Sequence, residues 1–378
     1  MTYFKRLMMP SQVFFSDLHT TRERNLFHKL QILLEKVGID SIIRPNDLVA
    51  IKLHFGEKGC TAFVSPIYLR VIVDKTKEYG GKPFLTDVNS LYVGPRTEAV
   101  SHHITAMENG FVYPVVNAPV IIAGGLRGNT AETIFIGLKH YQEVEIASEI
   151  MQADALVSVA HFKGHELTGF GGTIKNLGMG CAPRRGKLSQ HSTVKPEINP
   201  EICLGCGLCL RWCAFGAIRI KPGEDKAWID NSLCAGCGEC ILACPEEAVK
   251  LYWNESVAHV QEKMVEHLYG LLKNREGRVA FLNFITQVSP ACDCYPCSDT
   301  PIVGDIGILA STDPIAIDQA SVDLVQQAEG NRDSLLPHNL APGEDKFRAL
   351  YPEADWSIQL RYGEELGIGS RVYQLIKI

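Results

Sequence analysis

Eight cysteines between Cys203 and Cys244 form two copies of one spacing pattern, which constrains the chain more than any other feature. Each copy reads C-x-x-C-x-x-C-x-x-x-C, and the copies comprise Cys203, Cys206, Cys209, Cys213 and Cys234, Cys237, Cys240, Cys244. Three thiolates in so tight a loop bind three corners of a four-iron cluster, and the fourth reaches across to a second cluster. The spacing therefore predicts two 4Fe-4S clusters as cofactors.

The crossed pattern assigns one ligand of each copy to the cluster of the other copy. The first cluster is expected on Cys203, Cys206, Cys209 and Cys244, and the second on Cys234, Cys237, Cys240 and Cys213. Zinc sites and four disulfides are the alternatives for such cysteines. Zinc does not explain the third cysteine of each copy or Pro245 after the last one. Ala214 follows the first copy where a proline is usual, but that proline is not a ligand.

Length and charge limit the class of protein. A chain of 378 residues predicts about two to three domains. Its formal charge of -6 argues against nucleic acid as a partner, because phosphate binding requires a basic surface. No signal-peptide pattern opens the chain, and no run of about 18 apolar residues occurs. We therefore expect a cytoplasmic protein without membrane contact, and the 13 cysteines indicate a reducing compartment, as in an anaerobe.

Alternating short apolar runs and amphipathic stretches predict an α/β fold with a mostly parallel sheet and helices on both faces. Strands are expected at 47–53, 82–87, 119–123, 154–160, 278–285, 305–311 and 371–378. Helices are expected at 66–80, 96–110, 144–153, 256–274 and 313–328. The pattern continues on both sides of the cysteine copies.

This continuity predicts one discontinuous α/β domain, residues 1–196 and 253–378. A small α+β, bacterial-type ferredoxin domain with two clusters, residues 197–252, is then an insertion, which is tolerated where its ends lie close together. Three separate domains in a row are the alternative.

Polar residues repeatedly follow the predicted strands. In parallel sheets such residues lie at one edge, where ligands bind, so we expect them to converge. They are Lys52, His54, Glu57, Asp87, Asn89, His161, Lys163, His165 and Asp313.

A basic, glycine-rich segment at 161–191 is the densest group of candidate site residues. Lys163, His165 and Lys175 are the candidate catalytic residues. Glycine backbone and basic side chains suit an anion, so an anionic small molecule is a candidate ligand, with Lys163, Lys175 and Arg184 as contacts. Docking of the segment on the ferredoxin domain is an equal alternative, and a metal site on His161 and His165 is a further one.

Three further cysteines, Cys292, Cys294 and Cys297, lie within six residues. Disulfide staples are rare in a reducing compartment. The hypotheses are a third metal site, a redox-active thiol pair and a reactive loop without a role. A metal would need an open position or a fourth ligand, for which the candidates are His165, Cys181 and Asp305.

Several long motifs together resemble one family. They are VAIKLHFGEKG, GGKPFLTDVNSLY, GGLRG, HFKGHELTGFGGTIKNLGMGC, the two cysteine copies, CDC and DIGILASTDPIAIDQA. The chain is similar to the DUF362 iron-sulfur proteins, in which a DUF362 body carries a two-cluster ferredoxin module. The resemblance implies a prokaryotic 4Fe-4S electron-transfer protein without a settled substrate. Gly124 stands in GGLRG where an aspartate is expected.

Three hypotheses for function follow. In the first, the clusters exchange single electrons with a site on the body, as in an oxidoreductase, or with a partner redox protein. In the second, the body is a non-catalytic docking platform of a carrier subunit. In the third, the clusters have a structural or sensing role. The sequence holds no nucleotide, flavin or Ser-His-Asp motif, so enzyme and carrier both stay open.

Overall fold

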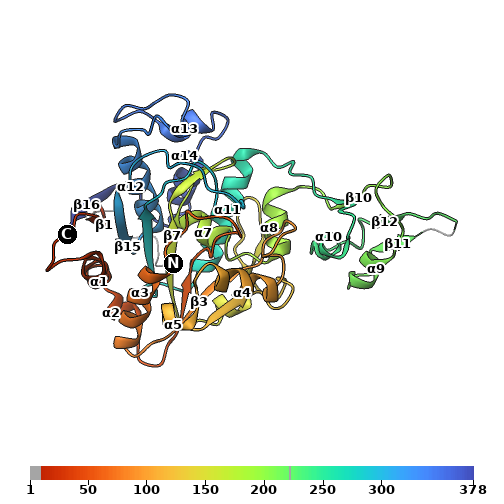
Figure 1. The fold of residues 1–378 in the computed structure, drawn as a ribbon. Helices are drawn as coiled ribbons and strands as arrows, with labels where there is room; N and C mark the ends of the chain where they lie inside the picture. The colour runs from red at the N-terminus through yellow and green to blue at the C-terminus, as the bar shows by residue number, and fades with distance from the viewer. Residues whose placement is uncertain (1–9, 221–222) are drawn as a thin grey trace.

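The computed structural model describes residues 10–220 and 223–378, and residues 1–9 of the predicted body lie outside them. An eight-stranded sheet crosses the body in the order β16-β1-β15-β14-β7-β2-β3-β4 (Figure 1). Its strands are β1 (Ser11–Asp17), β2 (Leu48–Lys52), β3 (Lys82–Val88), β4 (Val120–Ala123), β7 (Ala155–His161), β14 (Val279–Ile285), β15 (Gly307–Ser311) and β16 (Tyr373–Lys377).

The pairing of these strands confirms a mostly parallel sheet. The neighbours β14, β7, β2, β3 and β4 are parallel to one another. β15 is antiparallel to β14 and to β1, and β16 is parallel to β1. Within the described sheet, β15 alone therefore runs against the other strands.

Helices pack on both faces of the sheet, as predicted. One core contains residues of α1 (Leu26–Lys36), α2 (Ile39–Ile42), α3 (Pro66–Glu78), α4 (Ala99–Glu108) and α5 (Tyr113–Val116). The other contains residues of α6 (Ser148–Met151), α7 (Thr173–Gly178), α11 (Val257–Leu272), α12 (Pro314–Gln327), α13 (Lys346–Leu350) and α14 (Ser357–Glu365).

All seven residues of β7 are buried. A fully buried Val or Leu contributes roughly 1.5–3 kcal/mol. Burial on both faces therefore makes this central strand a rigid base for the loops at its end.

The prediction of a helix at 144–153 is wrong. The segment is the strand β6 (Glu143–Ala147) followed by the single turn of α6, and β6 pairs antiparallel with β5 (Ala131–Phe135). Val144 and Ile146 are buried, while Glu143 before them and Glu145 between them are not. Apolar residues two positions apart fit the period of a strand.

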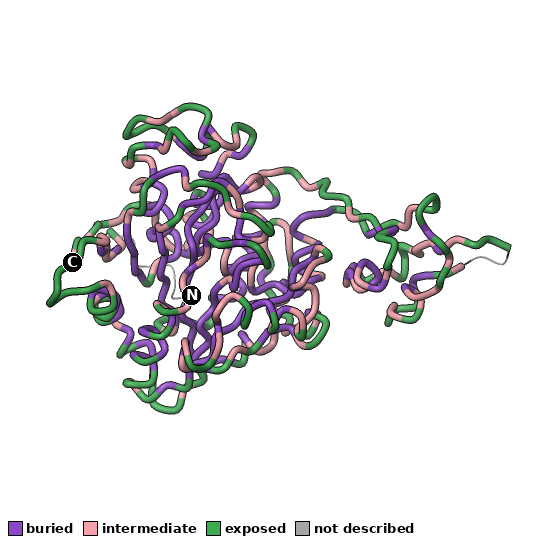
Figure 2. The backbone as a smooth tube through the Cα atoms, in the orientation of Figure 1, coloured by how far each residue is buried: buried purple, intermediate pink, exposed green. Residues whose placement is uncertain are grey.

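The described residues of the range 197–252 form a lobe that projects from the body, called the cysteine lobe below (Figure 1). It consists of two antiparallel pairs and two short helices. They are β10 (Glu197–Ile198) with β13 (Val249–Lys250), β11 (Ile218–Ile220) with β12 (Ala227–Ile229), α9 (Leu208–Trp212) and α10 (Glu239–Ala243). A small hydrophobic cluster of its own fills the lobe, and Figure 2 shows shorter buried stretches there than in the body.

The two ends of the cysteine lobe lie side by side, because Glu197 pairs with Lys250. The large sheet takes β1, β2, β3, β4 and β7 from the chain before the lobe and β14, β15 and β16 from the chain after it. In residues 10–220 and 223–378, we find no helix with the length and apolar character needed to cross a membrane.

Candidate functional site

The eight cysteines of the lobe line two separate pockets. One pocket is lined by Cys203, Cys206, Cys209 and Cys244, and is called the distal pocket below. The other is lined by Cys213, Cys234, Cys237 and Cys240, and is called the proximal pocket. Each pocket therefore receives its fourth cysteine from the other sequence copy. Occupation of these pockets by clusters stays a prediction.

The loops around both pockets supply matching hydrogen bonds to sulfur. Gly205 N–H donates to Cys203 Sγ and Gly236 N–H to Cys234 Sγ, each at 3.4 Å. Both glycines have positive φ, +67° and +69°, which other residues adopt only with strain. Donors to the cysteine sulfurs are one means by which proteins stabilise and tune iron-sulfur clusters. The loops thus fit such a cofactor.

The charge of the cysteines also fits a cationic group. Burial, followed by the neighbouring Cys237 and Cys234, raises the pKa of Cys240 to about 12. Four thiolates that line one pocket repel one another, and a bound metal removes this repulsion by coordinating them. Among the described residues, no three His, Cys, Asp or Glu side chains are grouped to bind a single metal ion.

Arg184, at the start of α8 (Arg184–His191), joins the proximal pocket to the body. Its side chain is fully buried. Its guanidinium donates to Ser90 O at 2.6 Å, Thr97 O at 3.2 Å and Leu91 O at 3.1 Å in the body, and to Gly238 O at 3.1 Å in the lobe. Burial lowers the pKa of Arg184 to about 10, and the nearby Cys237 opposes this.

A second contact lies beside it. Asn129 Nδ2 donates to Cys237 O at 3.2 Å, and Arg127 pairs with Glu239 at 3.2 Å. The Arg127 guanidinium also stacks 3.8 Å above the Trp212 ring. These contacts place the proximal pocket, and not the distal one, against the body.

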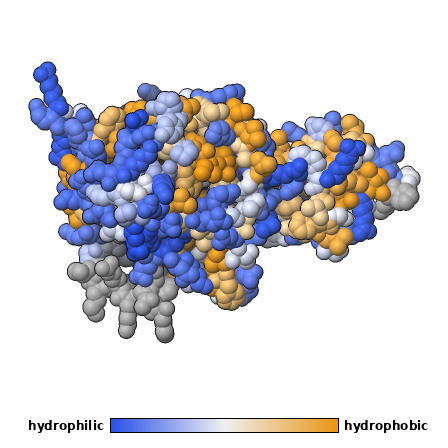
Figure 3. Space-filling model, turned by 90° about the horizontal axis from the view of Figure 1, so that it is seen from below, coloured by the Kyte–Doolittle hydropathy of each residue, from blue (hydrophilic) through white to orange (hydrophobic). Residues whose placement is uncertain are grey.

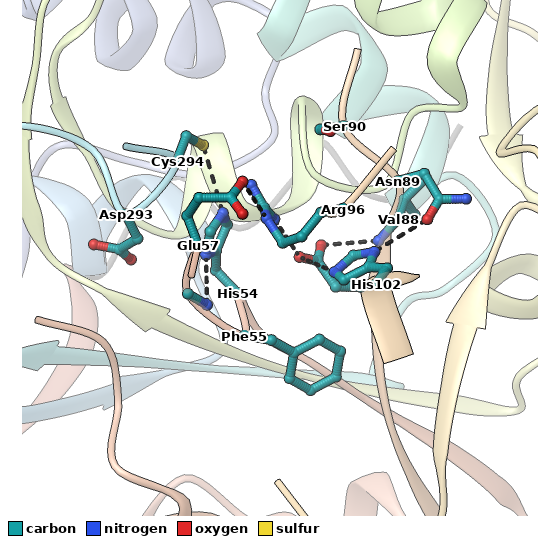
Figure 4. A network of polar contacts seen from close by, with 12 residues as sticks. His54, Phe55, Glu57, Val88, Asn89, Ser90, Arg96, His102, Asp293 and Cys294 are labelled. Atoms are coloured by element: carbon teal, nitrogen blue, oxygen red, sulfur yellow. Dashed lines mark hydrogen bonds and ion pairs between the residues drawn. The ribbon is translucent and has the colours of Figure 1, made fainter. Parts of the chain in front are cut away.

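The carboxyl ends of β2 and β3 carry a buried chain of ion pairs (Figure 4). Lys52 Nζ lies 2.9 Å from Asp87 Oδ1, and Asp87 Oδ2 lies 3.3 Å from Arg96 Nη1. Arg96 Nε lies 3.1 Å from Glu57 Oε2. All four side chains are at most 4% exposed. Burial alone would raise the pKa of Asp87, but Lys52 and the other cations lower it below its usual range.

The end of β7 contributes a second buried group. Asp293 Oδ1 lies 2.8 Å from His161 Nδ1, and its Oδ2 lies 3.0 Å from Lys163 Nζ. Burial alone would raise the pKa of Asp293, but His161 and Lys163 lower it below its usual range. The Asp293 carbonyl also accepts from Glu57 N–H at 3.0 Å. Residue 293 therefore attaches the loop after β14 to both β2 and β7.

The cysteine loop after β14 completes the site. Lys175 Nζ donates to Cys292 Sγ at 3.3 Å, and His54 Nε2 lies 3.4 Å from Cys294 Sγ. Tyr92 OH donates to Cys294 O at 3.0 Å. Figure 4 shows His54 and Cys294 pointing toward each other beside Glu57 and Arg96. The structure thus combines two thiols, a lysine and an imidazole in one buried polar site.

The three candidate catalytic residues lie around this site. Lys163 and Lys175 both lie against Gly171. A Cβ atom at this position would be 3.5 Å from Lys163 Cε and 3.1 Å from Lys175 Cδ. His165 is 5% exposed, and burial and Lys175 lower its pKa well below the usual range. Arg184, the third proposed anion contact, is instead bonded to four backbone carbonyls.

Other predicted residues lie elsewhere. Asp313 does not join the site but caps α12, because β15 is antiparallel and its carboxyl end lies at the opposite edge of the sheet. Cys181 is fully buried in the core, Asp305 is exposed and accepts from Gln287 N–H, and Cys297 is exposed. Binding of metal by the three cysteines of the loop stays a prediction.

Sequence reasoning missed Arg96 and Tyr92. Both lie in the irregular segment after β3, where the only available signal was a polar residue several positions beyond a strand. It also missed Asp293, which stands between two cysteines of the loop after β14.

Residues 49–323 match the family described as "Domain of unknown function (DUF362)". The chain belongs to this family. The match includes most strands of the large sheet, the cysteine lobe and the site residues from His54 to Cys294. No curated protein matches this DUF362 chain.

Two solved structures are similar to this DUF362 protein at low identity. The lactate racemase apoprotein from Thermoanaerobacterium thermosaccharolyticum has a TM-score of 0.34 and 12% identity, with 72% of this chain and 50% of that chain covered. A protein from Thermotoga maritima has a TM-score of 0.38 and 8% identity, with 90% and 58% covered. This chain therefore spans between half and three fifths of the length of these structures.

Proposed function

We propose that this DUF362 protein carries two 4Fe-4S clusters in the cysteine lobe and exchanges single electrons between a partner redox protein and the buried polar site of the body. The observation that carries this proposal is the grouping of the eight cysteines into two crossed pockets, one of which is attached to the body. Bound clusters would supply one-electron chemistry. The chain supplies their ligands, their hydrogen bonds and their position.

The two pockets differ in their surroundings, and this difference indicates the direction of electron transfer through the lobe. The proximal pocket touches the body through Cys237 O and Gly238 O. In the distal pocket Cys206 is exposed, and Leu204 beside it is 66% exposed. Electrons would therefore enter from outside at the distal pocket and reach the body from the proximal one.

The outer surface of the lobe suits a protein partner. Figure 3 shows apolar side chains gathered on this projecting part of the molecule. Its exposed apolar residues include Ile202, Leu204, Phe215 and Leu233. Exposed apolar patches rimmed by polar residues mark protein interaction sites. The partner we infer is a low-potential electron donor or acceptor.

The test is redox turnover of the anaerobically purified full chain. Dithionite should bleach its visible absorption, and a low-potential one-electron acceptor should restore it rapidly over repeated cycles. Clusters that are only structural would not cycle. A carrier subunit would also cycle, so this measurement tests conduction by the clusters and not the role of the body.

A further inference from the structure

The turn at residues 292–295 brings two sulfurs together within the polar site. Tyr295 N–H donates to Cys292 O at 3.1 Å and closes a β-turn. Cys294 N–H donates to Cys292 Sγ at 3.4 Å. Cys292 is 3% exposed, whereas Cys294 is half-buried.

The turn is held on both sides, so the sulfur positions do not depend on a mobile loop. The Asp293 side chain is clamped by His161 and Lys163. The backbone of Asp293 and Cys294 accepts from Glu57 N–H and Tyr92 OH. These contacts hold Asp293, the residue between the two cysteines, in place. They do not occupy the two sulfurs.

Each sulfur has its own proton-bearing neighbour. Lys175, itself buried, donates to Cys292 Sγ, and its pKa is raised, since the cysteines outweigh burial. His54 Nδ1 accepts from Gly56 N–H at 3.0 Å, so the neutral ring carries its proton on Nε2, the atom beside Cys294 Sγ. Burial lowers the pKa of His54, which keeps the ring neutral.

The thiols are unequal in acidity. The hydrogen bond from Cys292, followed by Lys175 and His54, lowers the pKa of Cys294 well below its usual range, although burial opposes this. The same hydrogen bond and burial raise the pKa of Cys292. One thiolate and one thiol side by side is the state from which a disulfide forms readily, because the thiolate is the nucleophile.

We propose that Cys292 and Cys294 form a two-electron dithiol–disulfide couple, the site at which the body exchanges electrons with the lobe. This inference rests on the proposed function for its electron donor. On reduction the S–S bond would break as the two sulfurs receive two electrons and two protons, and bound 4Fe-4S clusters would supply one electron each. On oxidation the S–S bond would form, the two electrons would return to the oxidised clusters, and two protons would leave. Lys175 and His54 are the adjacent groups through which the protons pass.

This arrangement gives the second cluster a purpose. A disulfide accepts electrons in a pair, whereas each cluster transfers one. Two reduced clusters together match the demand of one disulfide. Cys294, the more exposed and more acidic sulfur, is the atom that a substrate with a two-electron-reducible bond would reach.

The experiment measures the couple by mass spectrometry rather than by activity. The full chain is equilibrated anaerobically in dithiothreitol buffers of graded oxidation, quenched with acid, alkylated with N-ethylmaleimide and digested. The peptide with Cys292 and Cys294 should change from doubly alkylated to internally disulfide-bonded. The change from one tenth to nine tenths oxidised should span a roughly hundredfold range of buffer ratio, as a single two-electron step requires.

Variants separate the couple from a general thiol effect. Cys297→Ser should leave the titration unchanged, because Cys297 is exposed and outside the turn. Lys175→Met should slow alkylation of the reduced pair at least tenfold by removing the cation next to Cys292. A disulfide between Cys297 and either partner, or a pair that stays alkylated in every buffer, would overturn the inference.

Two further outcomes separate the thiol couple from the proposed electron transfer by the clusters. Metal that is bound at the turn and protects both thiols from alkylation until a chelator is added would also overturn the couple, in favour of the third metal site. The thiol titration does not require clusters, so it still reports when the lobe contains none. Clusters that cycle in a protein whose thiol pair never oxidises would leave the electron-transfer proposal standing without the couple.

Discussion

At the scale of single residues, Arg184 is the side chain on which the contact between body and lobe depends most. Replacement by Met would leave four carbonyls without their donor in a buried place, and breaking such a network costs about 3–5 kcal/mol. We expect Arg184→Met to lower the melting temperature and to speed tryptic cleavage between body and lobe. Arg219→Met, which changes a half-exposed arginine on the lobe, is the matched control. Equal melting and cleavage in both variants would show that Arg184 does not join the two parts.

Lys187 makes the folding stability of the protein depend on pH. Burial lowers the pKa of Lys187 to about 7, with Asp87 opposing and Lys52 adding to the shift. In an unfolded chain lysine titrates near about 10.4. Because the folded pKa is depressed, the stability contributed by Lys187 is fully present above about pH 10.4 and is lost as the pH falls toward about 7.

The matching experiment compares thermal unfolding at pH 7, 8 and 9. Wild type should gain stability relative to Lys187→Met by about 1 kcal/mol for each pH unit. Lys250→Met, at an exposed lysine of the lobe, should run parallel to wild type. If the stability of Lys187→Met also changes with pH in parallel with wild type, then Lys187 has the same pKa in the folded and unfolded chain.

At the scale of elements, α9 and α10 carry the fourth cysteine of each copy to the opposite pocket. Cys213 caps the end of α9 and Cys244 the end of α10. Cys213→Ser should therefore remove the cluster bound by Cys234, Cys237 and Cys240. Its surviving electron paramagnetic resonance signal should match that of Cys237→Ser and differ from that of Cys206→Ser. A match to Cys206→Ser instead would reverse the assignment of ligands.

The same scale shows how far sequence patterns reach. Strands β2, β3 and β7 could be predicted because each is a short apolar run, and the residues at their ends do converge. The direction of β15 could not, because an apolar strand has the same sequence pattern in either direction, so Asp313 was misplaced. Arg96 and Tyr92 reach the site through an irregular segment, and no period in the sequence indicates which way such side chains point.

At the scale of the whole molecule, the adjacent ends of the lobe allow its removal. We expect deletion of residues 197–252, with a short Gly/Ser linker joining the ends, to give a soluble, folded and colourless body, because Glu197 and Lys250 are paired neighbours and the sheet uses strands from both flanks. Circular dichroism and gel filtration test this. Insoluble material, with residues 1–196 and 253–378 each folding when expressed alone, would support separate domains.

The central claim is that the two crossed pockets hold iron-sulfur clusters, and the most direct measurement is the iron and acid-labile sulfide content of the full chain purified without oxygen. Two 4Fe-4S clusters predict about eight irons and about eight sulfides per chain. Zinc without sulfide, or a colourless chain with intact disulfides among these cysteines, would contradict it.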